Sequence, residues 1–306
     1  MAAICVCFLC GIGSAAFVWD VVPRPSSVAI RVDGDLVLIN AVVTDEHGTP
    51  VPNLDQGRFR LLEDGHEETI KYCMGQDGPV SIGLVLDTSR SMGDTLDAVK
   101  KAAIRFINTG NPSDEYFLLA FRNQPQIIVP FTSDADRLML AIGSVDAGGS
   151  TALLDALYLA MQEVRRGKYP RKALLVLSDE IDNHSRYSKQ ETRRLAQEAD
   201  YPVYAMNLWQ PPRSGNRYAI QRQDPGLLEE IARPTGGRTL TVRELRRLIP
   251  TAELISAEIR HEYVLAYTPS NRQMDGKLRH VRLRVDPTEV HHFKVSYRSA
   301  YRAPLQ

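Results

Sequence analysis

The strongest constraint on the fold is an alternation of strand-like and helix-like segments between residues 79 and 257. Residues 80–86 and 173–177 are continuous apolar runs, the pattern of strands that are buried on both faces. Apolar residues recur between them at helical spacing, as from Leu96 to Ile107. Strands that alternate with helices predict an α/β fold with a doubly wound, mostly parallel sheet. We expect further strands at 116–121, 127–131, 203–208 and 239–242, and further helices at 153–164, 192–199, 227–232 and 243–260.

Both ends of the chain predict β-structure instead. Residues 35–44 are rich in β-branched side chains, and Glu63-Asp64-Gly65-His66 is a hairpin turn signal. Near the other end, apolar residues alternate with arginines across 281–285. A few strands at each end are too few to be stable alone. We therefore expect the segments 30–76 and 261–306 to pack together as one small β-sandwich.

The first 25 residues predict export. Residues 2–19 carry no charged side chain, and a Ser-x-Ala cleavage signal ends at Ala16. This favours a secretory signal peptide or a membrane anchor, and hence a protein that is periplasmic, extracellular or anchored to the membrane by its N-terminus. Three of the four cysteines lie in this run, so Cys73 alone follows it and no internal disulfide is expected.

The charge composition argues against nucleic acid as a partner. Lys and Arg together number 37 and Asp and Glu together number 37, so the formal net charge is +0. Nucleic-acid binding requires a strongly basic surface. We expect no nucleic-acid partner, and contact with a membrane only through the N-terminal segment.

Three groups of oxygen-bearing side chains follow predicted strands or precede a predicted helix. Asp87-Thr88-Ser89-Arg90-Ser91 comes directly after residues 80–86, Thr151 follows Gly148-Gly149, and Asp179 comes just after residues 173–177. In open α/β sheets, ligands bind at the carboxyl ends of the strands. Carboxylates and hydroxyls are hard ligands that suit Mg²⁺, or alternatively Mn²⁺ or Ca²⁺.

Two other interpretations of these residues remain open. Ser, Thr and Asp are common helix N-caps and turn residues, which is the simplest alternative to a metal site. Ser89 or Ser91 could also form a hydrolase triad with Asp179 and His184. Because no phosphate-binding loop, nucleophile elbow or zinc-protease motif is present, we expect a protein that is not an enzyme. The pair His291-His292 is expected to be one exposed and one buried strand residue.

The three-part pattern resembles the metal-ion-dependent adhesion site of the von Willebrand factor type A (VWA) family, and in particular of exported bacterial VWA-related proteins. The resemblance implies a Rossmann-like VWA domain at 79–257 and the metal ligands Asp87, Ser89, Ser91, Thr151 and Asp179. It also implies that an acidic side chain of a partner protein completes the coordination of the metal. Glu180 departs from the family, which commonly has Gly there; its carboxylate would either join the coordination sphere or point to solvent.

Two functions of different class follow. The first is a divalent-metal-dependent protein-binding or adhesion module at the cell envelope or outside the cell, with an unknown protein partner. The second is a structural or envelope-assembly component whose metal site is vestigial or purely stabilising. For the first function, the long Pro- and Gly-containing stretch after residues 203–208 is the predicted partner-binding loop. Its candidate contact residues are Trp209, Arg213, Arg217, Tyr218 and Arg222.

Overall fold

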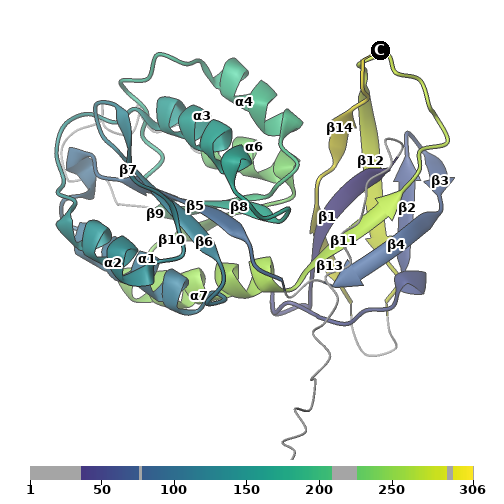
Figure 1. Cartoon of the computed structure of the whole chain (residues 1–306), viewed down its shortest axis with the longest axis horizontal. Coiled ribbons are helices and arrows are strands. Elements are labelled where there is room, and N and C mark those ends of the chain that lie inside the picture. The colour runs from purple at the N-terminus through teal and green to yellow at the C-terminus, as the bar shows by residue number, and fades with distance from the viewer. Residues whose placement is uncertain (1–35, 76–77, 209–225, 288–291, 306) are drawn as a thin grey trace, which may run out of the picture. The chain divides into compact units, whose positions relative to one another are not determined.

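The computed structural model describes residues 36–75, 78–208, 226–287 and 292–305 (Figure 1). Its largest sheet has the strand order β10-β9-β8-β5-β6-β7. All neighbouring pairs are parallel except β6 and β7, which are antiparallel. The predicted mostly parallel α/β sheet is therefore confirmed. The strand bounds are β5 Ser81–Asp87, β6 Glu115–Phe121, β7 Pro125–Thr132, β8 Lys172–Ser178, β9 Val203–Leu208 and β10 Thr239–Val242.

Helices cover both faces of this sheet (Figure 1). One face packs against α1 (Leu96–Asn108), α2 (Ala135–Ser144) and α7 (Leu248–Arg260). The other packs against α3 (Leu153–Glu163), α4 (Lys189–Glu198) and α6 (Leu227–Ala232). The neighbours Leu84 and Val85 on β5 point into these two different cores, and both are fully buried. This explains why the sequence of β5 is continuously apolar.

Two helical details differ from the sequence prediction. Helix α2 is absent from it, because only Leu138 and Ile142 of its ten residues are buried; Asp134 starts the helix by accepting a hydrogen bond from Arg137 N at 3.0 Å. The segment expected as one helix over 243–260 begins as a separate 3₁₀ turn, η5. The 3₁₀ turns are η1 Gln56–Arg58, η2 Arg90–Met92, η3 Val164–Arg166, η4 Arg233–Thr235 and η5 Leu245–Arg247.

The two ends of the chain form two antiparallel sheets with the orders β13-β1-β11-β4 and β14-β12-β2-β3. Strand β1 of the N-terminal segment pairs with β11 and β13 of the C-terminal segment, and β2 pairs with β12. Each sheet therefore needs both ends of the chain, as expected. The bounds are β1 Val37–Thr44, β2 Phe59–Glu63, β3 His66–Glu68, β4 Ile70–Gly75, β11 Glu262–Tyr267, β12 Leu278–Val285, β13 Lys294–Tyr297 and β14 Ala300–Arg302.

The predicted hairpin between β2 and β3 is present. Asp64 and Gly65 both have positive φ, 46° and 89°, as a two-residue turn of the primed type requires. Side chains of both sheets form one apolar core, which includes Ile39, Leu61 and Leu283. Cys73 is a half-buried free thiol, and burial raises its pKa to about 11, so it stays protonated.

Two predicted features lie outside the described residues. These are the leader within residues 1–25 and the loop residues 209–225, which include all five candidate partner contacts. No helix in the described ranges combines the length and the apolar character that a bilayer crossing requires.

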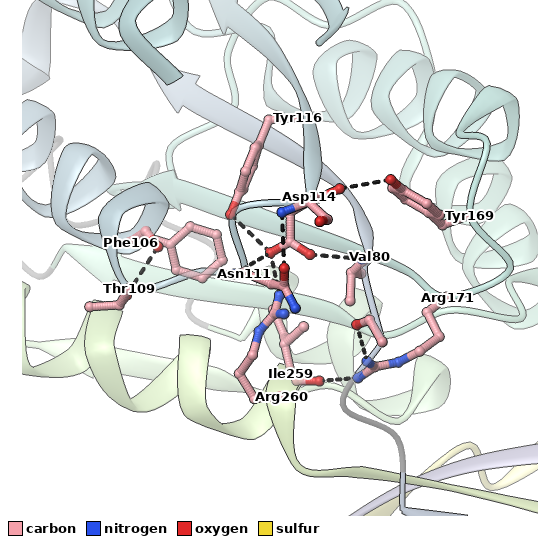
Figure 2. A network of polar contacts seen from close by, with 12 residues as sticks. Val80, Phe106, Thr109, Asn111, Asp114, Tyr116, Tyr169, Arg171, Ile259 and Arg260 are labelled. Carbon is pink, nitrogen blue, oxygen red and sulfur yellow. Dashed lines mark hydrogen bonds and ion pairs between the residues drawn. The ribbon is translucent and has the colours of Figure 1, made fainter. Parts of the chain in front are cut away.

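A polar network fixes the amino ends of β5 and β6 (Figure 2). Asp87 ends β5, so the candidate ligands lie at the opposite edge of the sheet. The buried Asp114 carboxylate accepts hydrogen bonds from Val80 N at 2.8 Å, Asn111 N at 2.9 Å and the Tyr116 hydroxyl at 3.2 Å, and it pairs with Arg260. Buried charges are tolerated when they are paired and hydrogen-bonded in this way. The network therefore joins the start of β5 to the end of α7.

A second buried ion pair near this edge predicts a pH dependence of stability. Glu262 lies 3.8 Å from Arg171, whose guanidinium also donates to the carbonyl oxygens of Gly78 and Ile259. Burial outweighs the attraction of Arg171 and raises the pKa of Glu262 from 4.5 to about 7. The folded protein thus binds the proton of the Glu262 carboxyl group more tightly than the unfolded chain does. The stability that this proton contributes is complete below pH 4.5 and is lost as the pH rises through 7.

Replacing Glu262 with Gln should remove that dependence. The unfolding free energy of Glu262→Gln relative to the parent is expected to rise by up to about 3 kcal/mol between pH 4.5 and 7, and to be level outside that window. Urea unfolding at a series of pH values measures this difference. A difference that does not change with pH would show that Glu262 ionises normally in the folded state.

Candidate metal centre

The topology of the sheet places the two candidate carboxylates on neighbouring strands. Asp87 is the last residue of β5, and Asp179 directly follows β8. These strands are parallel, with Leu86 opposite Leu177, so their carboxyl ends meet at the same edge. From β5 the chain continues to β6 and β7 on one side, and it later places β8, β9 and β10 on the other. This reversal of direction is where ligands bind in doubly wound sheets.

Asp87 is fully buried and is held on both oxygens. Its Oδ1 accepts a hydrogen bond from Ser89 N at 2.9 Å, and its Oδ2 accepts one from the Ser178 hydroxyl at 2.6 Å. Burial raises the pKa of Asp87, and the charge of Asp179 raises it further, while the bonds from Ser178 and Ser89 lower it. The side chain is thus fixed in direction, and no ion pair joins its carboxylate to a basic side chain within the described ranges.

Asp179 has a buried carboxylate oxygen that accepts no hydrogen bond from the part of the chain that the structure describes. The residue is only 4% exposed, and among the described residues its Oδ1 is a buried acceptor with no hydrogen bond. A hydrogen bond from the Ser91 side chain lowers its pKa, but burial is the larger effect and the pKa is raised. The Ser89 and Ser91 hydroxyl oxygens are 3.0 Å apart. Two buried carboxylates, an unpartnered oxygen and adjacent hydroxyls are a donor set that fits a hard divalent cation.

The loop that carries Thr151 packs on the Asp87–Ser91 segment through backbone hydrogen bonds. Gly148 N donates to Thr88 O at 2.8 Å, and Arg90 N donates to Gly149 O at 3.3 Å. Gly149 has a φ of 77°, and a Cβ there would lie 2.5 Å from the Asn123 side chain. Glycine is therefore needed at this position.

The segment after Asp179 fixes the same loop from the other side. The Asn183 side chain accepts a hydrogen bond from Thr151 N at 2.9 Å, and the backbone N–H groups of Asn183 and His184 both donate to Thr151 O at 3.0 Å. Thr151 is buried, as is Ser89, whereas Ser91 is partly exposed. The structure therefore brings together all three segments that carry the five candidate ligands.

Helix capping does not account for these residues. Ser89 precedes the turn η2, but its side chain makes no capping hydrogen bond. Ala152 occupies the N-cap position of α3, and the carboxylate of Asp182 accepts hydrogen bonds from Leu153 N at 2.9 Å and Leu154 N at 3.3 Å instead. The supporting roles of Asp182 and Asn183 are not among the features predicted from the sequence. The polar run that begins at Asp179, directly after a buried strand, was the available signal.

The carboxylate of Glu180 was expected either to join the coordination sphere of the metal or to point to solvent, and it does neither. Its side chain is buried, so it does not point to solvent, and its carboxylate is used by the protein itself. Oε1 accepts hydrogen bonds from Gly226 N at 3.0 Å and Leu228 N at 2.7 Å, and Oε2 accepts one from the Asn207 side chain. The carboxylate therefore caps the first turn of α6 rather than entering the candidate metal site.

The histidines in the described ranges lie at the surface. His184 is exposed on the segment that follows Asp179. His292 is exposed as well, and His291 lies outside the described residues. In the part of the chain that the structure describes, no three His, Cys, Asp or Glu side chains cluster as metal ligands. The candidate centre rests on two carboxylates and three hydroxyls.

Comparison with known proteins agrees with this architecture. Residues 82–181 match the sequence model of the von Willebrand factor type A domain. The chain is 26% identical over 183 residues to an uncharacterized protein of Borreliella burgdorferi, covering 53% of this chain and 54% of that protein. It is 32% identical over 110 residues to an uncharacterized protein of Synechocystis, covering 35% and 26%. The chain thus spans only 54% and 26% of the lengths of these curated relatives.

A solved structure shows the same fold. The von Willebrand factor type A protein from Catenulispora acidiphila superimposes with a TM-score of 0.52, covering 89% of this chain and 73% of that one. The two sequences are 12% identical, so the likeness is one of fold alone. Residues 82–181 are therefore similar in sequence to a von Willebrand factor type A domain, and the mostly parallel sheet to which they belong has the fold of that domain.

Proposed function

We propose that this chain is a protein-binding module that depends on a divalent cation, acts at the cell envelope or outside the cell, and is not an enzyme. The residues that would hold the cation are Asp87, Ser89, Ser91, Thr151 and Asp179. The observation that carries the proposal is the buried Oδ1 of Asp179, which has no hydrogen-bond partner among the described residues and lies beside the fully buried Asp87. Mg²⁺ is the expected ion, and Mn²⁺ or Ca²⁺ would suit the same oxygen ligands.

The ligand set explains why the partner should be acidic. Three of the five candidate ligands are neutral hydroxyls. The two carboxylates can balance the charge of a divalent cation but leave no excess negative charge that would repel a further carboxylate. When bound, a cation of this kind offers a coordination position that water fills until a carboxylate oxygen replaces it. The chain's own residues hold the donor oxygens in place and bury them. An Asp or Glu side chain of a partner protein is therefore the expected ligand, and recognition needs no chemical turnover.

The described residues on either side of the predicted partner loop support this function. Residues 209–225 lie outside the described ranges, but the residues that flank them are described. Asn207 and Gly226 both donate hydrogen bonds to Glu180, the residue next to Asp179. Asn207 and Gly226 therefore lie beside the candidate metal ligands. The residues that would contact the partner protein are Trp209, Arg213, Arg217, Tyr218 and Arg222.

A capture experiment tests the proposed function against a purely stabilising metal site. The parent chain, immobilised without residues 1–25, is incubated with envelope extract in Mg²⁺ or in EDTA. We expect Mg²⁺-dependent capture of a protein that an Asp87→Ala bait fails to retain. Equal capture in EDTA, or by the Asp87→Ala bait, would contradict metal-dependent binding and favour the stabilising role.

Fractionation of cells tests the proposed location. Full-length protein in the cytosolic fraction would contradict export.

A further inference from the structure

Glu180 holds a backbone conformation that side chains other than glycine rarely adopt. Its φ is 62°, in the left-handed region, and it directly follows the candidate ligand Asp179. Residues in this region persist when their surroundings hold them there, and such residues cluster at functional sites. The contacts around Glu180 must therefore hold it in this conformation.

The side chain of Glu180 is fixed to two elements of the domain. Its two carboxylate oxygens accept hydrogen bonds from three donors, of which two are backbone N–H groups at the start of α6 and one is the side chain of Asn207 on β9. Asn207 lies opposite Ser178 in the register of β8 and β9. The residue is only 4% exposed, so these hydrogen bonds are made away from competing water. The anchor is therefore rigid and close to the end of β8.

The backbone of Glu180 passes this constraint to both candidate carboxylates. Its N–H donates to the Ser178 hydroxyl oxygen at 3.2 Å, and the same hydroxyl donates to Asp87 Oδ2 at 2.6 Å. Asp179 lies between Ser178 and Glu180 in the chain, so both of its peptide neighbours are hydrogen-bonded in place. The anchored side chain of Glu180 thus fixes the backbone N–H that bonds to Ser178, and Ser178 in turn bonds to Asp87. It also fixes the turn that carries Asp179.

We propose that Glu180 is the positioning residue of the metal centre: it does not touch the ion, and its carboxylate, fixed to α6 and β9, holds Asp87 and Asp179 in the orientation that binds a divalent cation. The inference rests on the proposed function, because it presumes that the cation is bound. Groups that orient the ligands of a metal ion act in this indirect way.

A matched control separates positioning from ordinary helix capping. Glu191 also accepts hydrogen bonds at the start of a helix, in the capping box with Ser188 on α4, but none of its hydrogen bonds reaches the candidate ligands. Glu191→Ala therefore removes a cap without disturbing the centre. Glu180→Ala removes the anchor, and Glu180→Gln keeps an acceptor oxygen for the two N–H groups of α6.

The test is the affinity for Mn²⁺, measured by calorimetry on the parent and on the three variants, with thermal unfolding in EDTA as the measure of stability. Glu180→Ala is expected to weaken Mn²⁺ binding by about 10- to 100-fold, the range found when partners of metal ligands are removed. Glu180→Gln should bind more tightly than Glu180→Ala, and Glu191→Ala should bind Mn²⁺ as the parent does even if it unfolds at a lower temperature.

Several outcomes would overturn the inference. Parent-like Mn²⁺ affinity in folded Glu180→Ala would do so, as would an equal loss of affinity in Glu191→Ala. If Glu180→Ala does not fold, Asn207→Ala removes one of the three donors instead, and unchanged affinity in that variant would overturn the inference as well. Failure of the parent itself to bind Mn²⁺ would contradict the proposed function, and this inference with it, which distinguishes the two failures.

Discussion

Asp87→Ala is expected to weaken Mg²⁺ and Mn²⁺ binding by more than about 100-fold, beyond the range for residues that merely support metal ligands. The variant loses one of the two carboxylates at the centre, and the remaining hydroxyls and Asp179 balance too little of the charge of a divalent cation. Calorimetric titration with each ion gives the affinity directly.

The fold of Asp87→Ala should persist. Asp87 ends β5, and its side-chain hydrogen bonds are to Ser89 and Ser178, whereas the strand itself is held by pairing with β6 and β8. Removing a buried, unbalanced charge offsets part of the loss of those two hydrogen bonds. Asp97→Ala, at an exposed carboxylate in the first turn of α1, is the control and should leave metal affinity unchanged. Unchanged affinity in Asp87→Ala would refute the assignment of this ligand.

Deletion of residues 270–306 is expected to cause the largest loss of stability, because it removes β12, β13 and β14 together. The deletion takes Val281 and Leu283 out of the sandwich core, and each such side chain contributes about 1.5–3 kcal/mol when fully buried. It also removes the strands that pair with β1 and β2 and so leaves two unpaired edges. Because a domain is stable by only about 5–15 kcal/mol, the sandwich should unfold.

The measurement for this deletion is size-exclusion chromatography with thermal unfolding. We expect aggregation, since exposed strand edges pair between chains. Arg282→Ala, on the exposed face of β12, serves as the control and should remain monomeric with little change in stability. A truncated chain that stays monomeric and as stable as the parent would mean that the N-terminal strands do not depend on the C-terminal ones.

The sequence predicted the features of the fold that depend on burial. Continuous apolar runs identified β5 and β8 because both faces of these strands are covered, and the turn residues Asp64 and Gly65 identified a hairpin. Helix α2 was missed because few of its residues are buried, and a periodic signal needs more apolar positions. The pairing of the two chain ends was predictable because neither end can bury its strands alone.

The candidate site was predictable only in part. The positions of Asp87 and Asp179 follow from the strand ends that carry them, which the sequence reveals. The surroundings of Glu180 do not follow, because its hydrogen-bond partners, Asn207 and Gly226, are 27 and 46 residues away in the chain. The direction of a buried side chain depends on such distant contacts, and the local pattern of residues contains no information about them.

Titration of the parent chain with Mn²⁺, after removal of metal by a chelator, is the direct test of a divalent-cation site at Asp87 and Asp179. The oxygen ligands described here predict saturable binding of one ion per chain, which competition by Mg²⁺ reverses and Asp87→Ala abolishes. An absence of saturable binding by the folded parent chain would contradict a metal site at the buried carboxylates of Asp87 and Asp179.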